Sequence, residues 1–149
     1  MKTNKKLIAY RALSLVILFI IMLFIFLLSH QTADNSSQTS GWLTRLISFL
    51  LKEDIPDGLI RTIAHFIEFG ALGFFMNNAF FAFKEKGYIL LPVTLSFLYC
   101  VSDEVHQLFI PGRAFQISDL LVDFIGVFAG VILFYLIAST FKKHSQKKS

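Results

Sequence analysis

Four stretches of this chain are long and apolar enough to cross a lipid bilayer as helices. They run over about residues 7–28, 62–83, 88–109 and 117–137, each close to the roughly 20 residues that a spanning helix needs. Only 16% of the residues are charged, against about 25% in soluble domains. This composition disfavours a soluble globule and a disordered chain. We expect a single all-α integral membrane domain over residues 1–149, built as a four-transmembrane-helix bundle.

The first apolar stretch follows several lysines, as the core of a secretory signal peptide does. Its apolar run, residues 12–28, is longer than a signal core of about 7–15 residues, and no A-x-A cleavage pattern follows it. We therefore expect an uncleaved helix. The single cysteine, Cys100, cannot form an internal disulfide and is expected to fill apolar space.

Basic residues are distributed unevenly between the two ends of the expected spans. Ten of the 14 lysines and arginines lie on one side: at or before the start of the first span, between the second and third spans, or after the fourth span. The other four lie on the opposite side, in the loops after the first and third spans. Because basic loops stay in the cytoplasm, this predicts a multi-pass protein of the cell membrane with both termini cytoplasmic. Residues 138–149 form a basic cytoplasmic tail, and the loops at 29–61 and 110–116 face outward. The net charge of +4 then reflects orientation and membrane lipids as partners, not nucleic acid.

The first outer loop carries the pattern of a short amphipathic helix. Trp42, Leu46 and Leu50 recur at helical spacing, Ser40 is a suitable N-cap, and a Pro-Asp-Gly turn at residues 56–58 leads back toward the membrane. The helix is expected either along the outer membrane surface, with Trp42 at headgroup level, or against the ends of the spans.

The ionisable residues within the second to fourth spans all fall in their outer halves. They are His65, Glu68, Asp103, Glu104, His106, Asp119 and Asp123. Helical spacing places the first two on one face, and Asp103 with His106 and Gln107 on another. Because carboxylates at membrane depth normally mark a buried site, we expect a polar site at the outer end of the bundle. The alternative is that these groups only tie helices together, for example His65 with Asp123.

Two features of the outer end concern packing and anion binding. Gly126 and Gly130 continue the stripe of Asp119 and Asp123, and glycine lets a neighbouring helix approach closely. Arg113 is the only basic residue of its short loop, and it is expected to bind a phosphate or carboxylate or to pair with Asp119. Glu104, off the Asp103–His106 face, is expected either in the site or solvated.

Several motifs together resemble the VanZ-like family. Ser29-His30 and the following Ser36, Ser37 and Ser40 are similar to its S-H…S opening, and residues 65–69 (HFIEF) to its H-F-x-E-[YF] segment. Residues 102–107 (SDEVHQ) and 111–113 (PGR) resemble its D-E-x-H-Q…P-G-R signature, and residues 119–130 its closing D-x-x-x-[ND]-x-x-G-x-x-x-G. Phe69 stands where Tyr is frequent, so a hydroxyl at that place is dispensable or absent. The match runs over about residues 29–130.

The resemblance implies a polytopic protein of the bacterial cell envelope. The family's namesake is linked to low-level resistance to teicoplanin, a lipoglycopeptide that binds peptidoglycan precursors outside the membrane. An effect on glycopeptide susceptibility is therefore expected here. The resemblance supplies no reaction, but it agrees with an outward-facing site.

Three functions compete on the sequence alone. The first is an enzyme acting on a lipid-linked cell-wall precursor or another envelope substrate, by acid–base chemistry. Its catalytic candidates are His65, Glu68, Asp103 and His106. Its candidates for holding the substrate or an anionic headgroup are His30, Glu104, Gln107, Arg113, Asp119 and Asp123. The second is a non-catalytic protein that binds and shields envelope headgroups. The third, a transporter, is disfavoured because four helices are few and no inverted repeat is visible.

A divalent metal is a variant of the enzyme hypothesis. Asp103-x-x-His106 places two ligand types on one helix face, and His65 and Glu68 would complete a shell. The cofactor therefore stays open. The chain contains no phosphate-cradling glycine loop, no G-x-S-x-G and no C-x-x-C motif.

Overall fold

The structure, a computed structural model, describes residues 5–84 and 89–147. These residues form helices joined by short loops, with no strand among them. The helices are α1 (Lys5–Ser29), α2 (Ala33–Leu51), α3 (Asp57–Lys84), α4 (Leu90–Gln107) and α5 (Ile117–Lys147). The expected all-α architecture is confirmed.

Three helices contain segments that are long and apolar enough to cross a membrane. The segments are Lys5–Ser29, Gly58–Phe83 and Ile117–Thr140. The helix α4, with 18 residues, is long enough but not apolar enough, because its last turns are polar. The expected third span also began near Tyr88, which lies outside the described residues. Length and composition thus support three spans.

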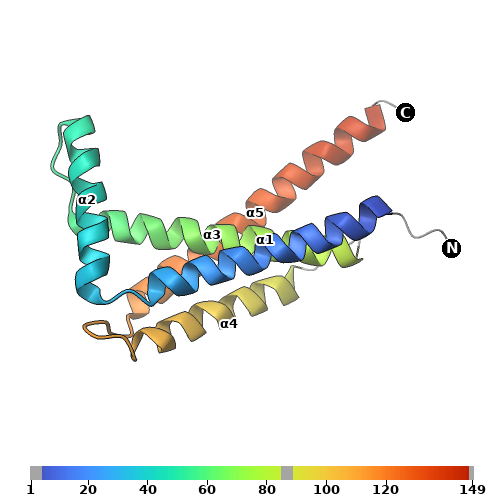
Figure 1. The fold of residues 1–149 in the computed structure, drawn as a ribbon. Helices are drawn as coiled ribbons and strands as arrows, with labels where there is room; N and C mark the ends of the chain where they lie inside the picture. The colour runs from blue at the N-terminus through green and yellow to red at the C-terminus, as the bar shows by residue number, and fades with distance from the viewer. Residues whose placement is uncertain (1–4, 85–88, 148–149) are drawn as a thin grey trace.

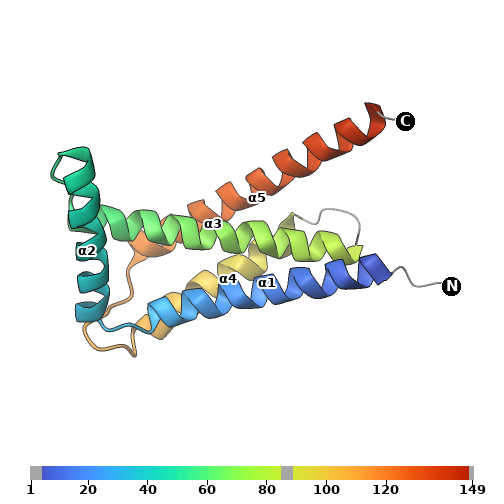
Figure 2. The same ribbon diagram turned by 45° about the horizontal axis from the view of Figure 1, so that its top comes forward.

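The long helices lie side by side, and α2 lies across one end of them (Figures 1 and 2). Both ends of the chain are at the other end of the bundle. The end near α2 therefore collects the last turn of α1, the first turns of α3 and α5, and the last turns of α4. These are the turns that contain the acids and histidines of the second to fourth expected spans.

Three helix boundaries differ from the sequence-based expectation. The N-cap of α2 is Thr32, whose side chain accepts a hydrogen bond from the Asn35 N–H, whereas Ser40 lies inside the helix. The helix α3 begins at Asp57, directly after Pro56, because proline favours a helix start. The helix α5 continues to Lys147 through much of the predicted tail, since no glycine or proline interrupts residues 131–147.

The closest helix contact joins α3 and α5. A Cβ added at Gly126 would press on the Phe66 carbonyl oxygen, and one added at Gly130 would overlap the Gly70 carbonyl oxygen. The expected close approach at these glycines is confirmed. Beside this contact lie the fully buried Phe69 and Val127, so the two helices are packed backbone to backbone near the polar end.

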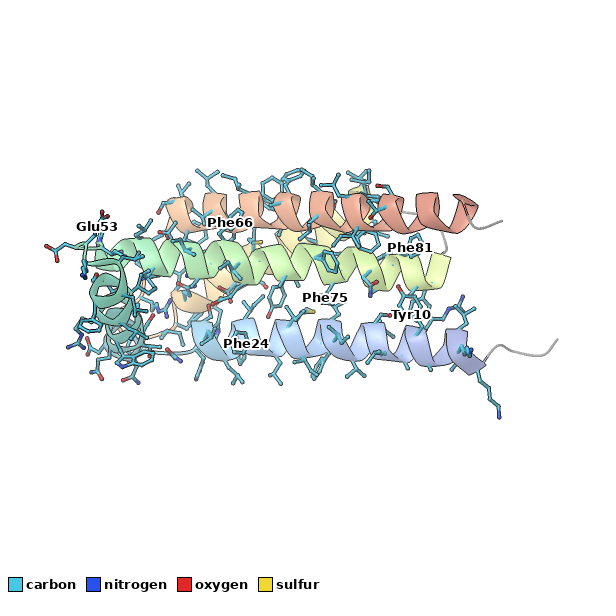
Figure 3. All side chains as sticks on the ribbon, turned by 90° about the horizontal axis from the view of Figure 1, so that it is seen from above. Tyr10, Phe24, Glu53, Phe66, Phe75 and Phe81 are labelled. Atoms are coloured by element: carbon cyan, nitrogen blue, oxygen red, sulfur yellow. The ribbon has the colours of Figure 1, made fainter. Side chains whose placement is uncertain are left out.

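The surface of the bundle is apolar. On α1, for example, Phe19 is 66% and Phe24 is 55% exposed, which suits a helix covered by hydrocarbon. Figure 3 shows Tyr10 near the end of the chain termini and Glu53 at the opposite end. Near the termini, the Tyr10 hydroxyl donates to Asn78 Oδ1 at 2.7 Å, which ties α1 to α3.

Candidate functional site

A cavity of about 190 Å³ lies at the end of the bundle that α2 covers. Its walls come from the end of α1, the first half of α2, the start of α3 and the loop before α5. The polar lining residues are Ser29, Gln31, Ser36, Thr39, Ser40, Arg61, His65, Glu68 and Arg113. Segments far apart in the sequence thus bring these polar groups to one chamber, whose walls also contain Leu28, Ile60 and Ala64.

The first pair of charged groups at the cavity is His65 with Asp123. His65 Nδ1 lies 3.0 Å from Asp123 Oδ1, and the Asp123 side chain is fully buried. This contact between α3 and α5 is the one given above as an example of polar groups that only tie helices together. The buried carboxylate fixes the orientation of the imidazole and leaves Nε2 for a ligand, as in hydrolases in which an aspartate orients a histidine base.

A second pair, Arg61 with Asp119, lies one helical turn closer to the ends of the same helices. Arg61 Nη2 is 3.1 Å from Asp119 Oδ2. The expected pairing of Arg113 with Asp119 is therefore wrong. Arg61 precedes His65 by four residues on α3, and Asp119 precedes Asp123 by four residues on α5. Because the two helices are packed together, each helix contributes one partner to each of two ion pairs in successive turns. That matched spacing is the sequence signal for Arg61 as a site residue, which the sequence analysis missed.

Arg113 reaches the cavity from the loop before α5. The turn that carries it has Pro111 followed by Gly112 at φ 77°, a conformation that favours glycine. Arg113 Nε donates to the Gln31 carbonyl oxygen at 3.2 Å, and Nη1 donates to Gln107 Oε1 at 3.3 Å. Partial burial, followed by the nearby Arg61 guanidinium, lowers the pKa of Arg113 from its usual value. The fold thus holds this cation with neutral acceptors.

Glu68 lies on α3 one turn after His65 and lines the cavity while half-buried. Its charged neighbours are His65 and Arg113 on the attractive side and Asp103 and Asp123 on the repulsive side. A carboxyl group among these groups is suitably located to exchange a proton with a ligand.

Asp103 and Gln107 lie behind the cavity wall and hold Ser29. The Ser29 hydroxyl donates to Asp103 Oδ2 at 2.6 Å, and Gln107 Nε2 donates to the same oxygen at 3.1 Å. Gln107 also binds Arg113, so these contacts link α1, α4 and the loop. Asp103 does not line the cavity itself, and in this arrangement it positions Ser29 and Gln107.

Glu104 is also buried in the wall, on the side of the loop before α5. Its Oε2 accepts a hydrogen bond from the Gln116 N–H at 2.9 Å, and the side chain is 0% exposed. The alternative of a solvated Glu104 is therefore wrong. The reason is that the loop folds back over α4 and covers the side chain.

His30 and His106 are brought together, but outside the cavity. Their Nδ1 and Nε2 atoms lie 3.2 Å apart, and both rings contact Phe26. Neither residue lines the chamber that contains His65 and Glu68. The structure therefore separates His106 and His30 from the other predicted site residues.

The predicted metal ligands do not converge on one point. In the part of the chain that the structure describes, no group of three or more His, Cys, Asp and Glu side chains is arranged to hold a metal ion. Asp103 contacts Ser29 and Gln107, whereas His106 contacts His30. Asp103 and His106, the two ligand types predicted on one helix face, therefore belong to separate contacts.

Helix α2 supplies hydroxyl groups that the sequence analysis did not assign to the site. Ser36, Thr39 and Ser40 line the cavity, and their spacing of three and four residues puts them on one helix face. That spacing was the available signal. It was missed because the expected helix began only at Ser40.

No curated protein and no solved structure matches the chain. A family model described as VanZ/LLP1 matches residues 14–138, which includes every residue that lines the cavity. The protein therefore belongs to the VanZ/LLP1 family.

Proposed function

We propose that this protein is a multi-pass cell-membrane protein that acts on a lipid-linked or other envelope substrate in an outward-facing cavity, and thereby affects susceptibility to glycopeptides such as teicoplanin. The observation that carries the proposal is the oriented His65–Asp123 pair next to Glu68 in one chamber. A base held by a buried carboxylate beside a second carboxyl group is an arrangement for proton transfer.

In the proposed reaction, His65 and Glu68 divide the roles of base and acid. His65 Nδ1 is engaged by Asp123 at 3.0 Å, so Nε2 is the nitrogen that accepts a proton. The proton that His65 accepts comes from an attacking water or hydroxyl group. Glu68 in its protonated form, one turn along the same helix, gives its proton to the leaving group as the bond between that group and the substrate breaks. Asp103 acts through Ser29 and Gln107 as a positioning residue.

The proposal includes α4 as a fourth span with both termini in the cytoplasm. Its 18 residues extend for about 27 Å at 1.5 Å per residue, close to the roughly 30 Å of a bilayer core. Asp103, Glu104 and Gln107 are buried, so its polar turn would not face lipid. The described lysines at the start of α1 and near the end of α5 lie at the opposite end from the cavity (Figure 1), which supports an outward cavity.

Cysteine labelling tests this orientation. Glu53 lies in the loop after α2, at the end of the molecule far from the termini (Figure 3). A Glu53→Cys variant in a Cys100→Ser background is expected to react with a membrane-impermeant maleimide on intact cells. Reaction only after the cells are lysed would contradict an outward cavity.

The catalytic role is tested by susceptibility. Glu68→Gln and His65→Gln are each expected to abolish the change in teicoplanin susceptibility that expression of the wild type produces, with unchanged protein level and thermal unfolding. Glu53→Gln, an exposed carboxylate far from the cavity, is the matched control and should behave as wild type. Full activity of both cavity variants would refute acid–base chemistry here.

The second candidate function is binding without chemistry. It is favoured by the hydrogen bonds that join Ser29, Asp103 and Gln107 to one another. Side chains that are already hydrogen-bonded in this way maintain the shape of the cavity wall. In that case the cavity shields an envelope headgroup, and Glu68→Gln retains the phenotype while substitutions that fill the cavity, such as Ala64→Leu, remove it.

A further inference from the structure

We propose that Arg61 and Arg113 together form a clamp for a phosphate group that enters the cavity. This inference rests on the proposed function of the cavity and specifies the chemical class of its ligand. We refer to the two side chains as the Arg61–Arg113 clamp. The sequence indicates Arg113 alone as a site for an anionic headgroup, whereas the structure adds the second guanidinium.

The first observation is that Arg113 is a half-buried cation with neutral partners. Its two hydrogen bonds go to the Gln31 carbonyl oxygen and the Gln107 side-chain oxygen. Within residues 5–84 and 89–147, no carboxylate lies within ion-pair distance of Arg113. The carboxylates of Asp103, Asp119 and Glu104 stabilise this cation only from beyond ion-pair distance, so its remaining guanidinium donors are left for an anion from outside the chain.

The second observation is an unused donor on Arg61. Its Nη2 is engaged by Asp119, but its Nε is buried and has no hydrogen-bond partner among the described residues. Buried donors are almost always paired. Arg61 lines the same cavity as Arg113, so one ligand in that cavity can contact both guanidinium groups, and a turn of the Arg61 side chain brings its buried Nε to that ligand.

Phosphate fits these two guanidiniums better than carboxylate does. A single arginine fork already matches the two oxygens of a carboxylate. A phosphate group offers three or four oxygens in a tetrahedron, so it accepts hydrogen bonds from two arginines in different planes. The mutual repulsion of the two cations, which contributes to the lowered pKa of Arg113, is relieved by an anion between them.

The position of the cavity favours a phosphate carried by a membrane amphiphile. Leu28, Ile60 and Ala64 line it beside the polar groups. Next to it, α2 exposes Trp42 by 62% and Phe49 by 80%, a composition typical of a helix at the membrane interface. Its volume of about 190 Å³ suits a headgroup rather than a drug-sized molecule, for which pockets are about 300–1,000 Å³.

Glu68 has a defined role in this arrangement. A carboxylate there would repel the phosphate, whereas a protonated carboxyl group donates a hydrogen bond to it. Glu68→Gln keeps a donor and removes the charge. This variant is therefore expected to retain phosphate binding even where it abolishes the susceptibility phenotype. Phosphate binding and the susceptibility phenotype thus test the ligand and the proposed acid–base reaction separately.

The test is titration calorimetry of the full chain in maltoside micelles, with dihexanoyl phosphatidic acid, inorganic phosphate and octanoate as probes. The wild type is expected to bind phosphatidic acid at least about tenfold more tightly than octanoate. Arg113→Gln and Arg61→Gln are each expected to weaken this binding by about 10- to 100-fold, as for loss of charge-assisted hydrogen bonds. Arg45→Gln, which removes an exposed arginine of α2 outside the cavity lining, is the matched control and should bind like the wild type.

Conservative variants cover the case in which a glutamine variant does not fold. Arg113→Lys and Arg61→Lys keep the charge but lose the fork, and both are expected to bind more weakly than the wild type. Tighter binding of phosphatidic acid than of inorganic phosphate supports the clamp with a lipid headgroup as the source. Equal affinities for phosphatidic acid and inorganic phosphate support the clamp with free phosphate as its ligand. Absence of phosphate binding, equal binding of octanoate, or affinities unchanged by substitution of both arginines would overturn the proposal.

Discussion

Replacing Gly130 by alanine is expected to force α3 and α5 apart at their closest contact. The added Cβ would overlap the Gly70 carbonyl oxygen and lie 2.9 Å from the Phe74 backbone nitrogen. Ordinary contacts of a Cβ begin at about 3.4 Å. Both neighbours belong to backbone, which cannot rotate away as a side chain can, so the helices themselves must separate by at least about 0.5 Å.

The expected cost has two parts. Overpacking of a tight interior typically destabilises by about 1–3 kcal/mol. A separation that extends two turns along α5 also lengthens the contact between His65 and Asp123, now 3.0 Å, beyond the roughly 3.2 Å limit of a good hydrogen bond. Gly130→Ala is therefore expected to lower both the unfolding free energy and the activity of the cavity.

Gly41→Ala provides a matched control for this prediction. A Cβ at Gly41, inside α2, meets nothing within 4 Å, so alanine should stabilise that helix by about 0.5–1 kcal/mol. Both variants can be unfolded in mixed micelles with increasing SDS and followed by circular dichroism. If Gly130→Ala proves as stable as Gly41→Ala, the close packing of α3 against α5 is wrong.

Three further predictions address the site itself. Gln107→Leu should destabilise the fold by about 1–3 kcal/mol, because Ser29 and Asp103 lose the hydrogen bonds from Gln107 and Arg113 Nη1 loses its acceptor, while only the bond between Ser29 and Asp103 remains. Urea or SDS unfolding measures this, and an unchanged midpoint would argue against the network. Gly112→Ala should destabilise the fold by about 1–2 kcal/mol, because φ at this position is 77°. It should also weaken phosphate binding, because it displaces Arg113. A phosphate affinity equal to that of the wild type would contradict the view that this turn supports Arg113. Dialysis against EDTA should leave the thermal unfolding temperature unchanged, since the described residues assemble no metal shell; a clear drop, restored by a divalent metal, would reinstate a metal centre.

Several site contacts were predictable because they depend on helical spacing alone. The pairing of His65 with Asp123 follows from two spans that bring acids and histidines to the same depth. The close approach at Gly126 and Gly130 follows from their place on the stripe of Asp123. Such inferences need only the helix period and the direction of each span, which the apolar stretches and the basic residues provide.

Other contacts were not predictable because they depend on which surfaces pack together. Glu104 lies off the polar face of α4, yet it is buried because the loop before α5 folds over it. His106 shares a helix face with Asp103, but neighbouring elements divide that face, so His106 contacts His30 outside the cavity. The helical period of a sequence shows which residues share a helix face, but it does not show which element packs against that face.

The sequence by itself determined the class of protein, the apolar helices and the end of the bundle at which the polar groups collect, because burial of apolar surface and helical periodicity are properties of local sequence. Only the tertiary structure decided that Asp119 binds Arg61 and leaves Arg113 with neutral partners. The physical reason is that ion pairing depends on the separation of side chains from distant segments, and the packing of α3 on α5 sets that separation.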